Sequence, residues 1–232
     1  MTHHYDLVQY PTSDTIKIVT HLLERITKTN DRIQQTSRHT SPYACFYARV
    51  IPNIDIQAYL VRILKYCPCA NECFLSLLVY FDRMSRNSSG LRIDSFNIHR
   101  LVITGIMVAS KFFSDVFYTN TRYAKVGGLP VSELNTLELQ FLKLNSFKLN
   151  VKVEELQQYG DQLLWHWIRS HKKATVVVAD ECYKKPDYQP IVHYTTDHRS
   201  NNNHLLNNYC SSNVLFKTEK SVSEKYDSIT RC

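Results

Sequence analysis

Three groups of residues in this sequence have side chains and spacings that could support chemistry. They are three cysteines (Cys67, Cys69 and Cys73), an arginine and an aspartate within apolar segments (Arg62 and Asp82), and a lysine and a glutamate in similar surroundings (Lys111 and Glu138). The sequence has no glycine-rich phosphate loop, nucleophile elbow or His-Glu-x-x-His pair. We therefore predict a protein that is not an enzyme and that uses no cofactor or small-molecule substrate.

The cysteine group does not have the spacing of a metal site. One residue separates Cys67 from Cys69, three separate Cys69 from Cys73, and no histidine lies nearby in the sequence. Structural zinc sites usually pair their ligands at other spacings and need a full tetrahedral set. We interpret the cysteines as small, soft side chains that fill a contact between two helices, and we predict no metal site.

The second group predicts a structural ion pair. Arg62 lies between Val61 and Ile63, and Asp82 follows Phe81. If the two helices that carry them pack antiparallel, the guanidinium and the carboxylate can meet. Such a pair fixes geometry more than it adds stability, so we assign it no catalytic role.

The third group suits contact with another protein. Lys111 ends a long apolar segment, and Glu138 lies beside Leu137 and Leu139. A solvated helix face explains either residue alone. Together they can form a polar pair at the edge of an apolar groove, where the lysine donates to backbone groups of a partner and the glutamate accepts from them.

Helices must position all these residues. Apolar side chains recur at three- and four-residue spacings, and the chain contains only 5 Gly and 7 Pro. The pattern predicts helices at about residues 13–26, 56–67, 71 to a turn at 88–90, 95–114, 131–146 and 153–170, with a short segment at 116–126. The helix at 95–114 is apolar on nearly every side and should lie at the centre. We predict an all-α fold.

The sequence divides into three regions. Residues 1–41 are predicted to form an N-terminal helix and a polar linker, residues 42–171 the main helical domain, and residues 172–232 a polar, mostly disordered tail. The valine-rich run at 174–179 resembles a strand but has no obvious partner. The three regions 1–53, 54–171 and 172–232 carry excesses of two, three and two positive charges. A net charge of +7 that is spread so evenly along the chain argues against nucleic acid binding, unless folding gathers it.

The cysteines and the apolar runs indicate the cellular compartment and whether a membrane is involved. The seven cysteines are odd in number, and no N-terminal apolar stretch reads as a signal peptide. We therefore expect an intracellular protein with reduced thiols, in the nucleus, the cytoplasm or both. The longest uncharged apolar run, residues 101–110, is half the length of a membrane-spanning helix, so we expect no membrane partner.

Several strings in the chain resemble the cyclin box. They are YLVRILKYC at 59–67, YFDR at 80–83, SFNIHRL at 95–101, MVASKF at 107–112, YAKVGGL at 123–129 and ELNTLE at 133–138. YAKVGG and ELN-x-LE are similar to one branch in particular, the fungal phosphate-signalling cyclins and the plant U-type (P-type) cyclins. The match covers roughly residues 16–160. The chain departs from the branch at Pro130-Val131 and Lys152-Val153, where two helix starts lose a hydroxyl cap worth about 1 kcal/mol each.

The resemblance implies a single cyclin box of five helices, with one further helix before it and one after it. It implies a regulatory subunit that binds and activates a cyclin-dependent protein kinase by packing on the regulatory helix of the kinase small lobe. Lys111 and Glu138 match the lysine and glutamate through which cyclins hold the kinase. Around them, the candidate apolar contacts are Phe112, Phe113, Tyr118 and Leu142, and Tyr123 and Lys125 are candidates for the rim.

Three other interpretations remain open from the sequence. A cyclin-like box also occurs in transcription factors that bind nucleic acid complexes, and the net charge permits that function. A small metal or redox enzyme would have to use the three clustered cysteines. A cyclin that binds a kinase without activating it would serve as a scaffold. The sequence does not distinguish phosphate response, cell-cycle entry and morphogenesis as the process served.

Overall fold

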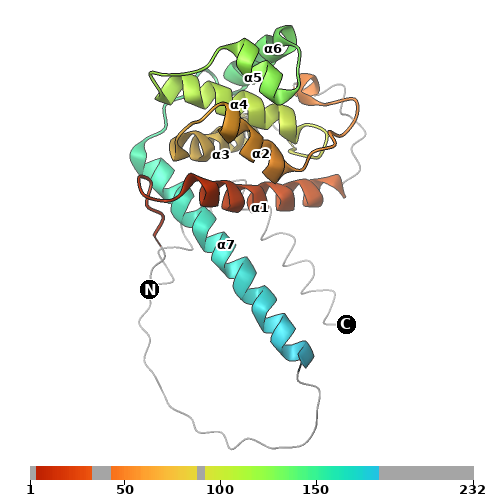
Figure 1. Cartoon of the computed structure of the whole chain (residues 1–232), viewed down its shortest axis with the longest axis vertical. Helices are drawn as coiled ribbons and strands as arrows, with labels where there is room; N and C mark the ends of the chain where they lie inside the picture. Colours follow the sequence, from red (N-terminus) through yellow and green to blue (C-terminus); the bar gives the residue numbers. More distant parts are fainter. Residues whose placement is uncertain (1–3, 33–42, 88–91, 183–232) are drawn as a thin grey trace, which may run out of the picture.

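The computed structural model describes residues 4–32, 43–87 and 92–182, with side chains up to residue 171. Within these ranges the chain forms seven α-helices, one short 3₁₀ helix and no β-strand, which confirms the predicted all-α class (Figure 1). The elements are α1 (Thr12–Asp31), η2 (Ala44–Phe46), α2 (Ile56–Tyr66), α3 (Asn71–Asn87), α4 (Ile98–Phe113), α5 (Asn120–Gly127), α6 (Val131–Leu144) and α7 (Val153–Cys182).

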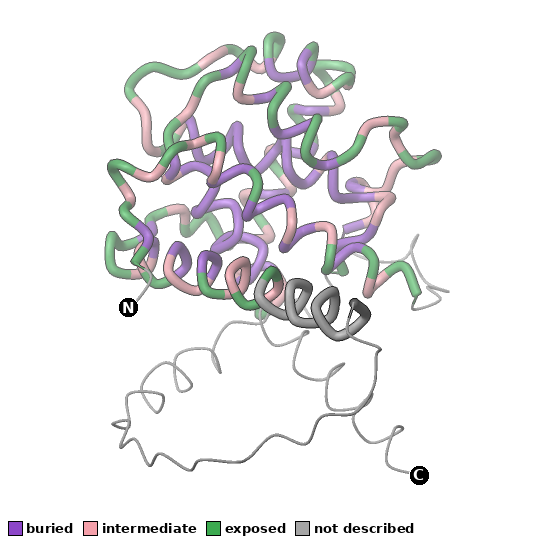
Figure 2. Tube along the Cα trace, turned by 60° about the horizontal axis from the view of Figure 1, so that its bottom comes forward, coloured by how far each residue is buried: buried purple, intermediate pink, exposed green. Residues whose placement is uncertain are grey.

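Helix α4 is the centre of the molecule, as its apolar sequence predicts. It packs against α2, α3, α5, α6 and η2, and its residues are buried from Ile98 to Ser110 with the exception of Arg100. Figure 2 shows this burial concentrated in the middle of the bundle, with exposed residues on the outer turns. The five helices α2 to α6 therefore surround one core, and α4 carries Lys111 at its end.

Close packing at the centre depends on Gly105. A β-carbon added at this glycine would lie 2.3 Å from Cδ1 of Leu77 on α3 and 3.1 Å from Cζ of Phe141 on α6. Both distances are shorter than ordinary van der Waals contact. The glycine therefore lets α3 and α6 approach the backbone of α4 from two sides.

Helices α1 and α7 lie together on one side of the bundle. α1 packs against α2, α3 and α7, and α7 also packs against α3. In Figure 1 α7 crosses α1 and continues beyond it. It ends at Cys182, later than the predicted 170, so the boundary placed at residue 172 falls inside a helix and residues 174–179 are helical. Residues 1–3 and 33–42 of the predicted N-terminal region, and 183–232 of the predicted tail, lie outside the described residues.

Helix starts follow from local side-chain chemistry. The carboxylate of Asp55 accepts from the amide of Ala58 at 2.6 Å and caps α2. α6 begins after Pro130 without a side-chain cap, in keeping with the departure seen in the sequence. α4 begins at Ile98 and not at 95, because Asp94 and Asn97 form a turn: the amide of Asp94 donates to Oδ1 of Asn97 at 2.9 Å.

Candidate functional site

The candidate site forms where the end of α4 and the start of α5 meet the middle of α6. Lys111 is in the last turn of α4, and its Nζ donates to Oε1 of Glu138 on α6 at 2.6 Å. Nδ2 of Asn120, at the start of α5, donates to Oε2 of the same glutamate at 2.8 Å and to Oδ1 of Asn135 at 2.7 Å. Residues far apart in the sequence therefore form one polar cluster, fixed by the packing of α4 and α5 on α6.

This pair keeps hydrogen-bonding capacity for a partner. The side chains of Lys111 and Glu138 retain 27% and 19% of their exposure, so both reach the surface. A lysine ammonium has three N–H donors, and the glutamate uses one lone pair on each oxygen for Lys111 and Asn120. Donors and acceptors therefore remain free on the same small area of surface.

The candidate apolar contacts lie close to the pair along the chain, on α4, on α6 and in the segment before α5. Phe112 is 46% exposed, and its ring meets that of half-buried Phe113 edge to face, with centroids 5.0 Å apart. Leu142, one helical turn after Glu138, is also half-buried. Tyr118 is half-buried, stacks edge to face on Tyr123 at 6.3 Å and lies under the guanidinium of Arg122 at 4.1 Å. Of these candidates, Phe112 presents the largest exposed apolar surface.

The structure adds residues that the sequence analysis did not select. One of them is Asn120. The others are exposed apolar side chains: Val116 (78% exposed) and Phe117 (52%) follow α4, Leu139 (47%) is on α6, and Phe147 (61%) follows α6. Large apolar groups that gather on one surface are typical of a protein interaction site, so these four residues are further candidates for that role. The sequence signal was present for Val116-Phe117, an apolar pair within an otherwise polar loop.

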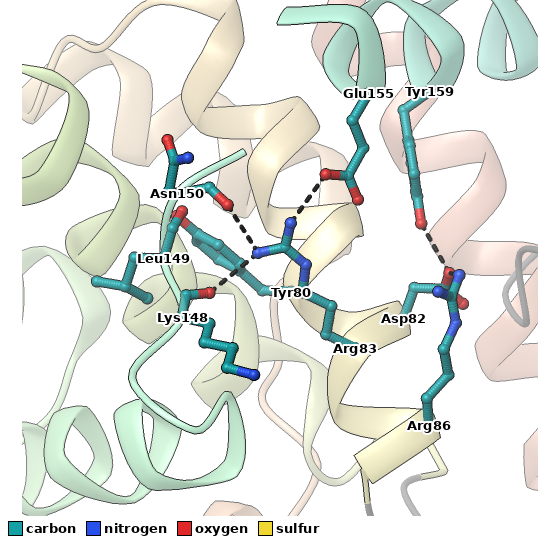
Figure 3. A network of polar contacts seen from close by, with 9 residues as sticks. All are labelled: Tyr80, Asp82, Arg83, Arg86, Lys148, Leu149, Asn150, Glu155 and Tyr159. Atoms are coloured by element: carbon teal, nitrogen blue, oxygen red, sulfur yellow. Dashed lines mark hydrogen bonds and ion pairs between the residues drawn. The ribbon is translucent and has the colours of Figure 1, made fainter. Parts of the chain in front are cut away.

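Phe147 is held in a restricted conformation. Its φ of 56° is in the left-handed region, which residues with a β-carbon adopt at a cost, and its amide donates to the carbonyl of Leu142 at 2.8 Å. The segment that follows is fixed by Arg83 on α3, whose Nη1 donates to the carbonyls of Lys148 at 2.9 Å and Asn150 at 3.0 Å (Figure 3). The same guanidinium binds Glu155 on α7 at 2.8 Å. Arg83 therefore fixes the exit of α6 against α3 and α7.

The predicted ion pair between Arg62 and Asp82 is wrong. Asp82 is fully buried, pairs with Arg86 one turn later on α3, and accepts from the hydroxyl of Tyr159 on α7 at 2.7 Å (Figure 3). Arg62 is exposed and donates to the carbonyl of Lys125 at 3.5 Å. The physical reason is the packing: α2 lies on α1, α4 and α5, so its outward face does not meet the side of α3 that carries Asp82.

The three cysteines lie where α2 ends and α3 begins. Cys67 and Cys73 are buried, Cys69 is half-buried, and all three thiols are free. A hydrogen bond with Cys73, together with burial, raises the pKa of the Cys69 thiol far above its ordinary value, which suits a packing group and not a nucleophile. The described part of the chain contains no group of three or more His, Cys, Asp or Glu placed to hold a metal ion.

A pocket of about 320 Å³ is present elsewhere on the surface. It is lined by residues from α2, α4, the end of α5 and the segment before α2, among them Ile54, Tyr59, Arg62, His99 and Arg100. None of the six candidate contacts around Lys111 and Glu138 lines it. The groove expected beside that pair therefore stays a prediction, whereas the exposed apolar side chains there are observed.

Comparison with known proteins agrees with this architecture. The cyclin family profile matches residues 13–149, which run from α1 to the exit of α6. The chain is 46% identical to PHO85 cyclin-like protein psl1 of Schizosaccharomyces pombe over 179 residues, 72% of this chain and 73% of that protein. It is 46% identical to PHO85 cyclin-7 of Saccharomyces cerevisiae over 182 residues, 70% of this chain and 64% of that protein.

A plant relative belongs to the second group that the sequence strings resemble. Cyclin-U4-1 of Arabidopsis thaliana is 43% identical over 117 residues, 50% of this chain and 58% of that protein. The chain thus belongs to the cyclin family, whose members are non-catalytic regulatory subunits of protein kinases. Its relatives include fungal PHO85 cyclins and plant U-type cyclins, which confirms the predicted branch. Among the described helices, none is long and apolar enough to cross a lipid bilayer.

Proposed function

We propose that this cyclin binds and activates a cyclin-dependent protein kinase by packing the Lys111–Glu138 cluster and its apolar neighbours on the regulatory helix of the kinase small lobe. The relatives named as PHO85 cyclins make a kinase of the PHO85 type the first partner to test. One observation carries the proposal: a lysine and a glutamate 2.6 Å apart reach the surface from two helices whose ends also carry exposed phenylalanines.

The chemistry of the cluster suits the end and side of a helix. The ammonium of Lys111 can donate to carbonyls left without partners at a helix C-terminus, and Glu138 can accept from exposed backbone amides. Phe112, Phe117 and Phe147 would then supply most of the apolar area removed from water, because each is about half exposed or more in the free chain. Asn120 holds the glutamate in place and so keeps the cluster in its binding geometry.

Activation follows if the cyclin binds one arrangement of the kinase better than the other. An active kinase needs a glutamate of its regulatory helix paired with the lysine of its ATP site. A cyclin surface that contacts this helix only in the inward position shifts the population toward the active state and contributes no catalytic group of its own. The interface is the site of regulation, and the kinase performs the chemistry.

Alanine variants of the pair test the proposal. We expect Lys111→Ala and Glu138→Ala each to weaken kinase binding by about tenfold or more and to lower activation in parallel, since both groups lie at the middle of the interface. The measurements are co-purification with a PHO85-type kinase and phosphate transfer to a standard substrate. Phe147→Ala, at an exposed position, is expected to weaken binding without altering the melting temperature.

The matched control is Lys17→Ala, which removes a lysine from the exposed face of α1, where it pairs with Asp14. Normal binding and activation by both variants of the pair would contradict the proposal. Normal binding with no activation by the unmodified chain would instead favour the scaffold interpretation.

A further inference from the structure

Folding gathers positive charge on one surface that the sequence spreads along the chain. Arg62 and Lys65 lie on the outward face of α2, and Arg122 and Lys125 lie on the outward face of α5. The two helices pack against each other. Contacts between them bring the four cations together: Arg62 donates to the carbonyl of Lys125 at 3.5 Å, and Nε of Arg122 donates to the carbonyl of Tyr66 at 2.8 Å. We call these four residues the basic strip.

The strip has no acidic counterpart in the part of the chain that the structure describes. Neither α2 nor α5 contains an aspartate or glutamate, and none of the four side chains forms an ion pair with a described carboxylate. By contrast, Arg100 nearby pairs with Glu133 at 2.6 Å. Each helix also carries its two cations three residues apart, a spacing at which like charges repel. Backbone carbonyls and the ring of Tyr118 hold the two arginines in place, but no described carboxylate offsets the repulsion between the like charges.

Apolar groups accompany the cations. Val61 is 49% exposed one helical turn before Lys65, and Tyr66 is 47% exposed with the Lys65 ammonium 5.4 Å from its ring centre. The exposed face of α2 therefore carries apolar side chains beside its two cations. Binding of nucleic acid usually rests on more phosphate contacts than four cations can supply. A polypeptide that carries carboxylates and one or two apolar residues matches both parts of this surface.

We propose that the basic strip docks an acidic, carboxylate-rich segment of a protein other than the kinase. Four cations spread along two helices suit several separate carboxylates better than one phosphate, which needs donors converging on a point. The aliphatic stems of the lysines, Val61 and Tyr66 would pack against the apolar residues of the segment. The inference goes beyond the kinase proposal, because it uses the outward faces of α2 and α5 and not the Lys111–Glu138 cluster.

A binding assay with the full chain tests this. The probe is a fluorescein-labelled peptide of about twelve residues, mostly Asp and Glu with one central Leu. Its binding is measured by fluorescence anisotropy at low and physiological salt. We expect Arg62→Glu combined with Lys65→Glu to raise the Kd about tenfold, since two exposed ion pairs are lost. Arg122→Gln combined with Lys125→Gln is expected to raise it less, and replacing the peptide's Leu by Ser should also weaken binding.

The matched control is Lys17→Glu combined with Lys28→Glu, which makes the same charge change on exposed positions of α1. An equal loss of binding in this control would overturn the proposal, because net charge alone would then explain the effect. An unchanged Kd in the Arg62 and Lys65 variant would overturn it too. So would tighter binding of a twelve-nucleotide RNA or DNA than of the peptide, or loss of kinase co-purification in the Arg62 and Lys65 variant.

Discussion

The hydroxyl of Tyr159 enters the buried space between α7 and α3, where it donates to the fully buried carboxylate of Asp82 at 2.7 Å. Burial, together with the neighbouring carboxylate, raises the pKa of Tyr159 well above its ordinary value, so the phenol stays protonated and keeps donating. Arg86 supplies a positive charge at the same oxygen, Oδ2 of Asp82. A buried carboxylate of this kind is tolerated only while both partners remain.

Removing this phenol tests its role. We expect Tyr159→Phe to lower the free energy of unfolding by about 1.5–3 kcal/mol, because it removes a hydrogen bond to a charged group and leaves part of the carboxylate unsatisfied. Urea titration followed by circular dichroism measures the change. Tyr66→Phe, which alters an exposed tyrosine, serves as the control and should change stability little. Equal stability of the Tyr159 variant and the unmodified chain would contradict this account.

A pH effect is expected from His99. Burial lowers the pKa of this histidine below its ordinary value, although Nε2 lies 2.8 Å from the carbonyl of Ile54. The folded state therefore binds a proton less readily than the unfolded state. The stability that neutral His99 contributes is complete above the pKa of histidine in the unfolded chain, about 6.5. It is lost as the pH falls from there toward the lower pKa of His99 in the folded chain.

The measurement compares melting temperatures at several pH values between 7.5 and 5. His99→Gln, which keeps a side-chain donor for Ile54, should show a smaller decrease on acidification than the unmodified chain. The other histidines are common to both proteins, so the difference between the two curves reports on His99. Parallel curves would show that this residue does not titrate differently on folding.

Residue-level contacts were predictable only where the helix faces were. Lys111 and Glu138 could be paired because the strings that carry them, MVASKF and ELNTLE, resemble the cyclin box. The partners of Asp82 could not be predicted. They are an arginine four residues later on the same helix and a tyrosine on α7, and apolar periodicity does not say which helices are neighbours. Asn120 was missed because a polar residue at a helix start is common and carries no distinguishing pattern.

At the scale of the elements, α4 depends on the absence of a side chain at Gly105. We expect Gly105→Ala to destabilise the fold by about 1–3 kcal/mol, because the new methyl group would overlap Leu77 and crowd Phe141. Alanine has a higher helix propensity than glycine and would stabilise the helix if packing did not change. The sign of the change in unfolding free energy therefore separates the packing effect from the propensity effect. Chemical denaturation measures it, with Thr121→Ala on the exposed face of α5 as the control. A stabilised variant would show that α3 and α6 can move apart at no cost.

The helices themselves were largely predictable from the sequence, and their ends were less so. The three- and four-residue apolar spacing located the starts of α1 to α4, α6 and α7 to within a few residues, because burial of one helix face determines that spacing. α5 was seen only as a short segment, since its 8 residues hold too few apolar positions for a period. The end of α7 was placed too early because the residues after 170 no longer show one apolar face.

At the scale of the whole molecule, the N-terminal segment joins distant parts of the chain. Tyr5 is fully buried, its amide donates to Asp161 on α7 at 2.7 Å, and its hydroxyl lies 2.6 Å from that of Thr15 on α1. Its ring occupies the space left by Gly160, where an added β-carbon would lie 2.5 Å from Cδ1 of the tyrosine. The segment therefore holds α7 against α1.

We expect Tyr5→Ala to lower the free energy of unfolding by about 3–5 kcal/mol, as for other large buried aromatic side chains. The measurement is urea unfolding of the full chain. Val8→Ala in the same segment is the control, because Val8 is 88% exposed and its loss should change stability little. A cost in the tyrosine variant no larger than that of the control would mean that the segment only rests on the surface. This contact was not predictable from the sequence, since a single tyrosine before a helix shows no periodic pattern.

The attachment of Tyr5 to α7 also bears on how the protein is made. A ribosome releases the N-terminal residues long before it has synthesised Asp161 and Gly160, so the tyrosine emerges with no surface to bury it. The nascent chain must carry an exposed aromatic ring until nearly the whole domain has left the exit tunnel. Completion of the native fold is therefore a late event in translation. A chain interrupted before α7 would expose Tyr5 to chaperones.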